Sequence, residues 1–231
     1  MNIVILTGAG ISAESGIPTF RGNDGLWNGY KVEDVATPNG FARNPQMVLD
    51  FYNSRRIDVQ SAKPNDAHFA IAKLQADPNH TVTLVTQNVD DLHEKAGSTN
   101  VIHMHGSLSK SLCTTCHTVA DASNNMKITD ICSECNKATV RPDIVWFGEI
   151  PYYMDDIETH LNNADMFVSI GTSGNVYPAA GFVNIARKRK IDTVELNLEP
   201  TGNPYNFTYR MYGPATVVVP QWVERVLQTS N

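Results

Sequence analysis

Four cysteines arranged in two close pairs give the clearest chemical signal in the sequence. Cys113 and Cys116 form one C-x2-C pair, and fifteen residues later Cys132 and Cys135 form the second. Each pair can offer two thiolates to one metal ion, so the two pairs together predict a tetrahedral zinc site. Four protein ligands leave no position for water, and we therefore expect a structural Zn²⁺. Two disulfides would be unusual in a cytosolic chain, and haem attachment to CTTCH (113–117) would leave the second pair unexplained.

A glycine-rich segment follows the first apolar run. Gly8, Gly10 and Ala13 fit the pattern G-x-G-x-x-A of dinucleotide-binding loops. Main-chain N–H groups at the start of the expected helix suit a pyrophosphate, but a tight strand-to-helix turn without a ligand is an equal alternative. An ordinary dehydrogenase also carries an acid at the end of the second strand, ~20 residues further on, where this chain has a loop. Asn197 and Glu199 are later candidates for holding a ribose.

Polar side chains gather after two further apolar runs. TQNVDDLH (86–93) carries Gln87, Asn88 and Asp90, and VIHMHGS (101–107) carries His103 and His105. Parallel sheets bind ligands at the carboxyl ends of their strands, and a histidine there can act as a general base near neutral pH. If the segment is a strand, the two histidines share a face. A histidine bound to a turn, and Asn88 and Asp90 as helix caps, are the structural alternatives.

Tyr52 and Arg55 stand three residues apart in DFYNSRRID (50–58) and are neighbours on one face of a helix. A guanidinium offers a carboxylate two parallel donors, and a phenol adds a third. The alternative is that Arg55 is a solvated surface residue and Tyr52 packs in the core.

The elements that position these residues alternate between strand and helix. We expect strands in 2–10 up to the glycines, 81–88, 166–172, 193–199 and 215–220, and helices at 45–59, 65–76, 155–163, 178–190 and 221–229. The alternation predicts an α/β fold with a doubly wound parallel sheet, Rossmann-like, and a small zinc-binding and helical domain. Residues 1–30, 80–110 and 143–231 would form the large domain, 31–79 a helical insertion with acyl-pocket residues, and 111–142 a zinc-binding module.

Composition limits the class of protein. The 231 residues suffice for one sizeable core with a small satellite. The net charge of −6 argues against a general binder of nucleic acids or membrane surfaces. No run approaches the ~18 apolar residues of a membrane span, and the first residues do not form a signal peptide. We expect a cytoplasmic protein, and nothing in the sequence demands more than a monomer.

Taken together, these segments resemble the sirtuins, the NAD-dependent protein deacylases. The resemblance runs from Gly8 to Ala215 and rests on GAGISAESGIPTFRG, TQNVDDLHEKAG, HMHGS, both cysteine pairs, VWFGE, GTSGNVYPAA and NLE. It implies that the acyl oxygen of a modified lysine attacks the nicotinamide ribose carbon of NAD. Nicotinamide leaves, and the products are free lysine and an O-acyl-ADP-ribose. NAD would be a consumed co-substrate and Zn²⁺ structural.

The resemblance also assigns residues. The catalytic histidine of the family precedes a glycine, which selects His105 as general base, acting with Asn88 and Asp90. NAD would be bound by Gly8, Ala9, Gly10, Ile17, Phe20, Arg21, Trp27, Gln87, Asn88, Val89, Asp90, Gly171, Thr172, Ser173, Asn197, Leu198, Glu199 and Ala215. An acylated peptide would lie as an added strand between 145–149 and 174–178, against Val145, Phe147, Gly148 and Val176.

Tyr52 and Arg55 match a pair in the desuccinylase-like subgroup (class III, bacterial type), where they read the carboxylate of succinyl-lysine or a similar acyl group. Ala36 matches a small residue that leaves room for the longer acyl chain. The resemblance thus implies removal of acetyl and succinyl groups. The histidine motif departs from the family, with HMHG in place of a common acid-leucine pair before the histidine. ADP-ribosyl transfer to a protein, a dehydrogenase and a non-catalytic zinc module are the competing functions.

Overall fold

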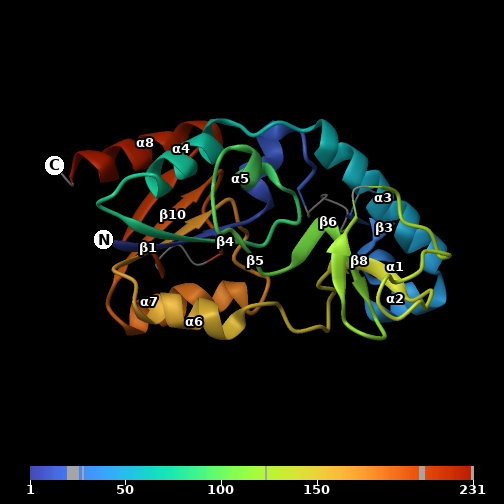
Figure 1. The fold of residues 1–231 in the computed structure, drawn as a ribbon. Helices are drawn as coiled ribbons and strands as arrows, with labels where there is room; N and C mark the ends of the chain where they lie inside the picture. The colour runs from blue at the N-terminus through green and yellow to red at the C-terminus, as the bar shows by residue number, and fades with distance from the viewer. Residues whose placement is uncertain (20–25, 28, 123, 203–205, 230–231) are drawn as a thin grey trace.

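The computed structural model describes residues 1–19, 26–27, 29–122, 124–202 and 206–229, and its centre is a six-stranded sheet (Figure 1). The strand order is β11-β10-β9-β1-β4-β5, and every neighbouring pair is parallel. The strands are β1 (Asn2–Thr7), β4 (Thr81–Thr86), β5 (Ile102–His103), β9 (Met166–Ile170), β10 (Asp192–Asn197) and β11 (Tyr209–Tyr212). After β1 the chain first forms β4 on one side of it and later β9 on the other side. The carboxyl ends of these three strands therefore meet at a topological switch point, where such sheets bind ligands.

Helices cover both faces of the sheet. Helices α4 (Asp66–Gln75) and α8 (Ala215–Gln228) lie on one face, and α6 (Met154–Asn162) and α7 (Phe182–Lys188) lie on the other (Figure 1). Successive side chains of a strand point to opposite faces. Ile3 and Ile5 of β1 accordingly pack toward α4 and α8, while Val4 and Leu6 pack toward α6 and α7. This three-layer arrangement buries β1 on both sides, as its run of apolar residues requires.

A smaller unit lies beside the sheet. It contains the three-stranded sheet β7-β6-β8 and the helices α1, α2 and α3, which pack around one apolar cluster (Figure 1). Its elements are α1 (Val32–Val35), α2 (Pro38–Arg43), α3 (Pro45–Ser61), β6 (Gly106–Cys113), β7 (Val119–Asp121) and β8 (Val140–Ile144). The remaining elements are the 3₁₀ helices η1 (Ala9–Ser15) and η2 (Ala179–Gly181), the short strands β2 (Leu26–Trp27) and β3 (Tyr30–Lys31), and α5 (Leu92–Lys95).

The predicted fold class is confirmed, with one error in the elements. The segment 215–220 is not a strand but the beginning of α8, and the helix expected at 221–229 is the rest of the same helix. The valines of this segment favoured a strand prediction because β-branched residues are common in strands. The buried residues that follow, however, continue at helical spacing. Val218, Trp222 and Val226 are buried four residues apart, with Val219 and Val223 beside them. The outer strand of the sheet is β11 instead, which no prediction covered.

The division of the chain into three segments remains a prediction. Helix α4 belongs to the predicted helical insertion at 31–79, yet it packs on α8 at the large sheet. Within the described part of the chain, no helix is long and apolar enough to cross a membrane.

Candidate active site and metal centre

A cavity of about 580 Å³ lies between the carboxyl ends of β1, β4 and β9 and the small unit. It brings together the following predicted residues: Gly8, Ala9, Gly10, Ile17, Trp27, Ala36, Tyr52, Arg55, Gln87, Asn88, Val89, Asp90, His105, Val145, Phe147, Gly148, Gly171, Thr172, Ser173, Val176, Asn197, Leu198 and Ala215. Glu199 lines a neighbouring cavity of about 250 Å³, which shares Ser173, Asn197 and Leu198 with the first. Phe20 and Arg21 lie outside the described residues. Apart from these three, the predicted NAD, catalytic and acyl residues thus face one cavity.

Three glycines form a close backbone crossing at the floor of this cavity. The N–H of Gly10 donates to the carbonyl oxygen of Gly171 over 2.8 Å, and a Cβ on Gly10 would lie 2.7 Å from the Gly171 Cα. Gly171 itself has φ +60°, and a Cβ there would lie 2.4 Å from the Ile11 nitrogen. A Cβ on Gly8 would lie 2.9 Å from the Gly171 carbonyl oxygen. Only residues without a side chain allow this approach. The helix expected after the loop is the short 3₁₀ helix η1.

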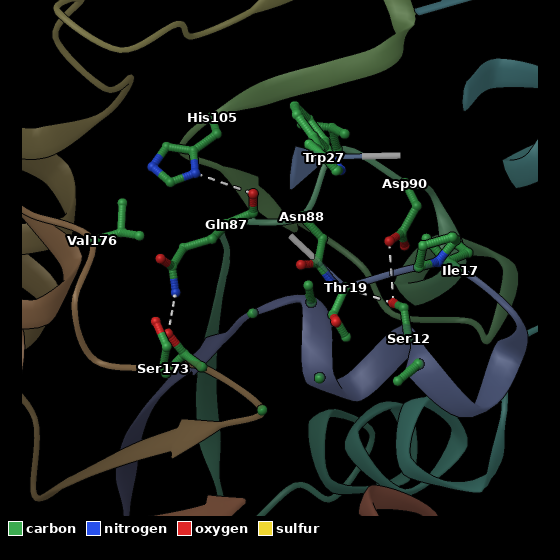
Figure 2. Close-up of a pocket in the computed structure, with 18 of the residues that line it drawn as sticks. Ser12, Ile17, Thr19, Trp27, Gln87, Asn88, Asp90, His105, Ser173 and Val176 are labelled. Carbon is green, nitrogen blue, oxygen red and sulfur yellow. Dashed lines mark hydrogen bonds between the residues drawn. The ribbon is translucent and has the colours of Figure 1, made fainter. Parts of the chain in front are cut away.

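A buried hydrogen-bonded chain joins Ser12, Asn88 and Asp90 (Figure 2). The Asn88 Nδ2 donates to the Ser12 Oγ over 3.2 Å, and the Ser12 Oγ donates to the Asp90 Oδ2 over 3.1 Å. The other Asp90 oxygen accepts from the Leu92 N–H over 3.1 Å, so Asp90 also supports the start of α5. Burial raises the pKa of Asp90, against the opposite effect of these hydrogen bonds. The sequence analysis missed Ser12, whose position in the glycine-rich motif was the available signal.

His105 reaches the cavity with a defined tautomer. Its Nδ1 lies 3.1 Å from the carbonyl oxygen of Gln87 (Figure 2). A carbonyl oxygen only accepts, so Nδ1 carries the proton and the neutral ring keeps a lone pair on Nε2. Burial lowers the pKa of His105, although the bond to Gln87 acts in the opposite direction. The ring is therefore neutral near pH 7, as a general base must be.

His103 has a different environment and does not line the cavity. Its Nδ1 lies 3.2 Å from the Asn88 carbonyl oxygen and its Nε2 lies 2.7 Å from the Glu94 Oε1. Burial alone would lower the pKa of His103, but the bond and the charge of Glu94 outweigh it and raise the pKa. The two histidines do not share a strand face, because β5 ends at His103 and β6 begins only at Gly106.

The Tyr52 and Arg55 side chains are both buried at the inner end of the cavity. Tyr52 is 0% exposed and its hydroxyl accepts a hydrogen bond from the Trp146 Nε1 over 2.9 Å. Arg55 is only 4% exposed, so the interpretation of a solvated surface arginine is wrong. Tyr52 does pack in the core of the small unit. The Arg55 Nη1 lies 3.9 Å from the Asp58 Oδ2, whose side chain is 41% exposed, and burial lowers the pKa of Arg55.

Two donors of Arg55 have no acceptor among the residues that the structure describes. Within the described residues, neither its Nε nor its Nη1 forms a hydrogen bond. The guanidinium lies 5.6 Å from the ring of Trp27, which partly compensates its charge. Buried donors without partners are rare and costly in a folded protein, so the Nε and Nη1 of Arg55 remain available to an acceptor that enters the cavity.

The segments predicted to hold the peptide are fixed to the catalytic region. The Val145 N–H donates to the carbonyl oxygen of His105 over 2.9 Å, and the Phe147 N–H donates to that of Ala36 over 3.0 Å. Ala36 is 4% exposed and adds little bulk beside Tyr52, whereas Phe147 is 46% exposed at the mouth. This arrangement connects the acyl end of the cavity to the outer surface.

The four cysteines form a compact group suited to one zinc ion. Their sulfur atoms all lie within 4.8 Å of one another, with Cys113 and Cys135 3.6 Å apart and Cys116 and Cys132 3.5 Å apart. Tetrahedral Zn–S bonds of about 2.3 Å require sulfur atoms about 3.8 Å apart. Both pairs end in a turn with positive φ, at His117 (+61°) and Asn136 (+55°). The chemistry of four thiolates with this spacing fits structural zinc.

The fold and the cavity together define an α/β enzyme that accommodates a dinucleotide co-substrate beside a four-cysteine metal centre. Comparison with known proteins agrees, since the Sir2 family matches residues 8–178. An NAD-dependent protein deacylase of Caulobacter vibrioides is 54% identical, over 98% of this chain and 97% of its own. A Sir2 homologue solved with NAD superposes with a TM-score of 0.87, at 41% identity over 99% of this chain and 90% of that one. A mutant Sir2 homologue solved with 2′-O-acetyl-ADP-ribose gives 0.90, at 41% identity over 99% and 93%.

The chain therefore belongs to the Sir2 family and is an NAD-dependent protein deacylase.

Proposed function

We propose that this deacylase removes both acetyl and succinyl (acidic acyl) groups from lysine side chains, releasing nicotinamide and O-acyl-ADP-ribose. The observation that carries the proposal is the pair of Arg55 donors, Nε and Nη1, which are buried in the cavity near Tyr52 and find no acceptor in the part of the chain that the structure describes. A carboxylate placed there would accept from Arg55 and from Tyr52 at once. An acetyl group has no carboxylate, so the same cavity can hold it without using either donor.

The general base in this proposal is His105. Its neutral ring presents Nε2 to the cavity, where it can take a proton from a ribose hydroxyl of NAD and so promote attack on the acyl carbon. Asn88 and Asp90, joined through Ser12, would orient the nicotinamide ribose and the leaving group. The only other histidine in the motif, His103, is engaged at both nitrogens and does not reach the cavity.

NAD would occupy the part of the cavity above the three-glycine crossing. Gln87 donates to Thr172 over 3.1 Å and Asn197 donates to the Thr172 carbonyl over 2.9 Å, so the ends of β4, β9 and β10 present one polar rim. The 2′-O-acetyl-ADP-ribose bound to the solved homologue is the product type that we propose here. An acylated peptide would enter as a strand between 145–149 and 174–178. The four cysteines would hold one Zn²⁺ without taking part in the chemistry.

The enzyme would act as a monomer in the cytoplasm on acylated-lysine proteins, with no membrane and no direct nucleic-acid partner. The substrate class follows from the family, and the other statements rest on the sequence and stay predictions.

The deciding experiment gives one peptide in acetyl-lysine and succinyl-lysine forms, with and without NAD, and follows the masses of all products. We expect both peptides to lose their acyl group only with NAD, with succinyl turnover equal to or above acetyl turnover. Acetyl turnover alone would overturn the acidic-acyl proposal. Addition of ADP-ribose to the peptide, without loss of the acyl group, would favour the competing transferase function.

A further inference from the structure

Trp146 makes the only hydrogen bond that the described residues offer to the Tyr52 hydroxyl. The indole Nε1 of Trp146, which follows β8, lies 2.9 Å from the Tyr52 Oη on α3. Both residues line the inner end of the cavity, and Trp146 is 3% exposed. Trp146 is the second residue of the motif VWFGE (145–149).

The direction of this bond is fixed by chemistry. An indole N–H can only donate, so the Tyr52 oxygen is the acceptor. The single hydroxyl hydrogen of Tyr52 must then point away from the indole and is available to another acceptor. Burial raises the pKa of Tyr52, so the hydroxyl keeps this hydrogen across the neutral range. Tyr52 is thereby prepared as a donor.

The indole is itself held in place from two sides. The Arg141 guanidinium lies 4.1 Å from the Trp146 ring centroid, and its Nη2 forms a 2.7 Å ion pair with the Glu149 Oε1. The other Glu149 oxygen accepts from the Trp146 main-chain N–H over 2.8 Å. Phe41 packs against the same ring with centroids 5.2 Å apart. These contacts with Arg141, Glu149 and Phe41 fix the position of the indole N–H.

We propose that Trp146 is a specificity-determining positioning residue, whose indole N–H directs the Tyr52 hydroxyl hydrogen toward the carboxylate of an acidic acyl group next to Arg55. The inference rests on the acyl preference proposed above and deepens it. An acyl group ending in a methyl gains nothing from an oriented donor, whereas a carboxylate gains one charge-assisted hydrogen bond. Trp146 acts through Tyr52 and takes no part in the reaction with NAD.

The test is Trp146→Phe, which keeps an aromatic ring under Arg141 and removes the N–H. We expect kcat/KM for the succinyl peptide to fall about tenfold, mostly through KM, because one oriented hydrogen bond to a charge is lost. The acetyl reaction, measured on the same preparation, should fall by a clearly smaller factor, and thermal unfolding compared with the wild type is the control for folding.

A double-mutant cycle separates this role from a structural one. In a Tyr52→Phe background, Trp146→Phe should cause no further loss of succinyl turnover. Glu149→Gln weakens the ion pair with Arg141 and so loosens the support of the indole, and it should give a smaller fall in the ratio of succinyl to acetyl turnover. An unchanged ratio in Trp146→Phe or in Glu149→Gln, or equal losses with both peptides, would overturn the role of Trp146 alone. A wild-type enzyme without succinyl turnover would overturn the proposed function and this role with it.

Discussion

The Nδ1 of His105 and the carbonyl oxygen of Gln87 lie 3.1 Å apart, and this contact fixes which nitrogen of the ring can accept a proton. Because the carbonyl can only accept, the basic nitrogen is Nε2, on the side of the cavity. The strand end that supplies Gln87 also supplies Asn88 and Asp90, so one short segment orients both the base and the polar groups around it.

A pH profile tests this relationship. Burial lowers the pKa of His105 below its ordinary value of about 6.5, so the neutral base predominates at pH 7 and is lost only in more acidic solution. We expect kcat/KM to be flat from pH 7 to 8 and to fall tenfold per unit on an acid limb whose midpoint lies below pH 6.5. His105→Asn should abolish turnover at every pH. An acid limb with its midpoint above pH 7 would contradict the buried neutral histidine.

Arg55→Met tests whether Arg55 binds the carboxylate of a succinyl group. We expect succinyl turnover to fall at least about 30-fold, corresponding to ~2 kcal/mol, because the acyl carboxylate would be left buried without a partner. Acetyl turnover should change less than about threefold. The melting temperature should not fall, since the variant removes a buried charge whose Nε and Nη1 have no acceptor among the described residues.

The matched control is Arg56→Met, on the same helix. Arg56 is 3% exposed but lies outside the cavity, and its Nε donates to the Leu108 carbonyl over 2.9 Å. This variant should lower stability and reduce both activities together. If Arg55→Met behaved in the same way, Arg55 would be a structural residue and the specificity proposal would fail.

Most residues of the site could be predicted from the sequence, but the long-range contacts between them could not. Gly8, Gly10 and the cysteine pairs were recognisable because their chemistry depends on residue type and short spacing. Trp146 and Tyr52 are 94 positions apart, and no local sequence pattern predicts a hydrogen bond between residues so distant in the chain. The burial of Arg55 could not be predicted either. Helical spacing shows that Tyr52 and Arg55 are neighbours on one face, but not which other elements pack over that face. The strand predicted at 215–220 was wrong because the β-propensity of its valines was outweighed by the packing of a helix on the sheet.

Loss of zinc should disable the enzyme without removing any cavity residue. Cys113 ends β6 and the quartet closes the loops between β6 and β8, while Val145 just after β8 bonds to His105. We expect Cys132→Ser to lose bound zinc, to melt at a lower temperature and to lose turnover of both peptides, because structural zinc sites contribute directly to folding.

Zinc content by elemental analysis, together with thermal unfolding, checks the zinc prediction. His117→Asn is the control, since His117 follows the first cysteine pair at φ +61° and asparagine tolerates that conformation. This variant should keep one zinc per chain and normal activity. Full activity in a zinc-free Cys132→Ser protein would refute the structural role.

Acid stability should depend on His68, which is completely buried under the cavity floor. Its Nδ1 lies 3.3 Å from the Asn65 main-chain nitrogen and 3.1 Å from the Asn65 Oδ1, and its Nε2 lies 3.5 Å from the Ser12 Oγ. Burial lowers the pKa of His68 to about 4. The unfolded chain would bind a proton near pH 6.5, whereas the folded protein would bind it only near pH 4.

The sign of the acid effect follows from this difference. The stability from a neutral His68 is fully present above pH 6.5 and is lost as pH falls toward 4, by up to about 3 kcal/mol. His68→Gln should be less stable at pH 7.5, because the buried contacts of the ring with Asn65 and Ser12 are lost, yet its free energy of unfolding should fall less steeply between pH 6.5 and 4.5. Urea unfolding at a series of pH values measures both effects. His160→Gln, at an exposed position on α6, should keep the wild-type slope. Parallel slopes for wild type and His68→Gln would show that His68 is protonated in the folded protein and that its burial carries no acid penalty.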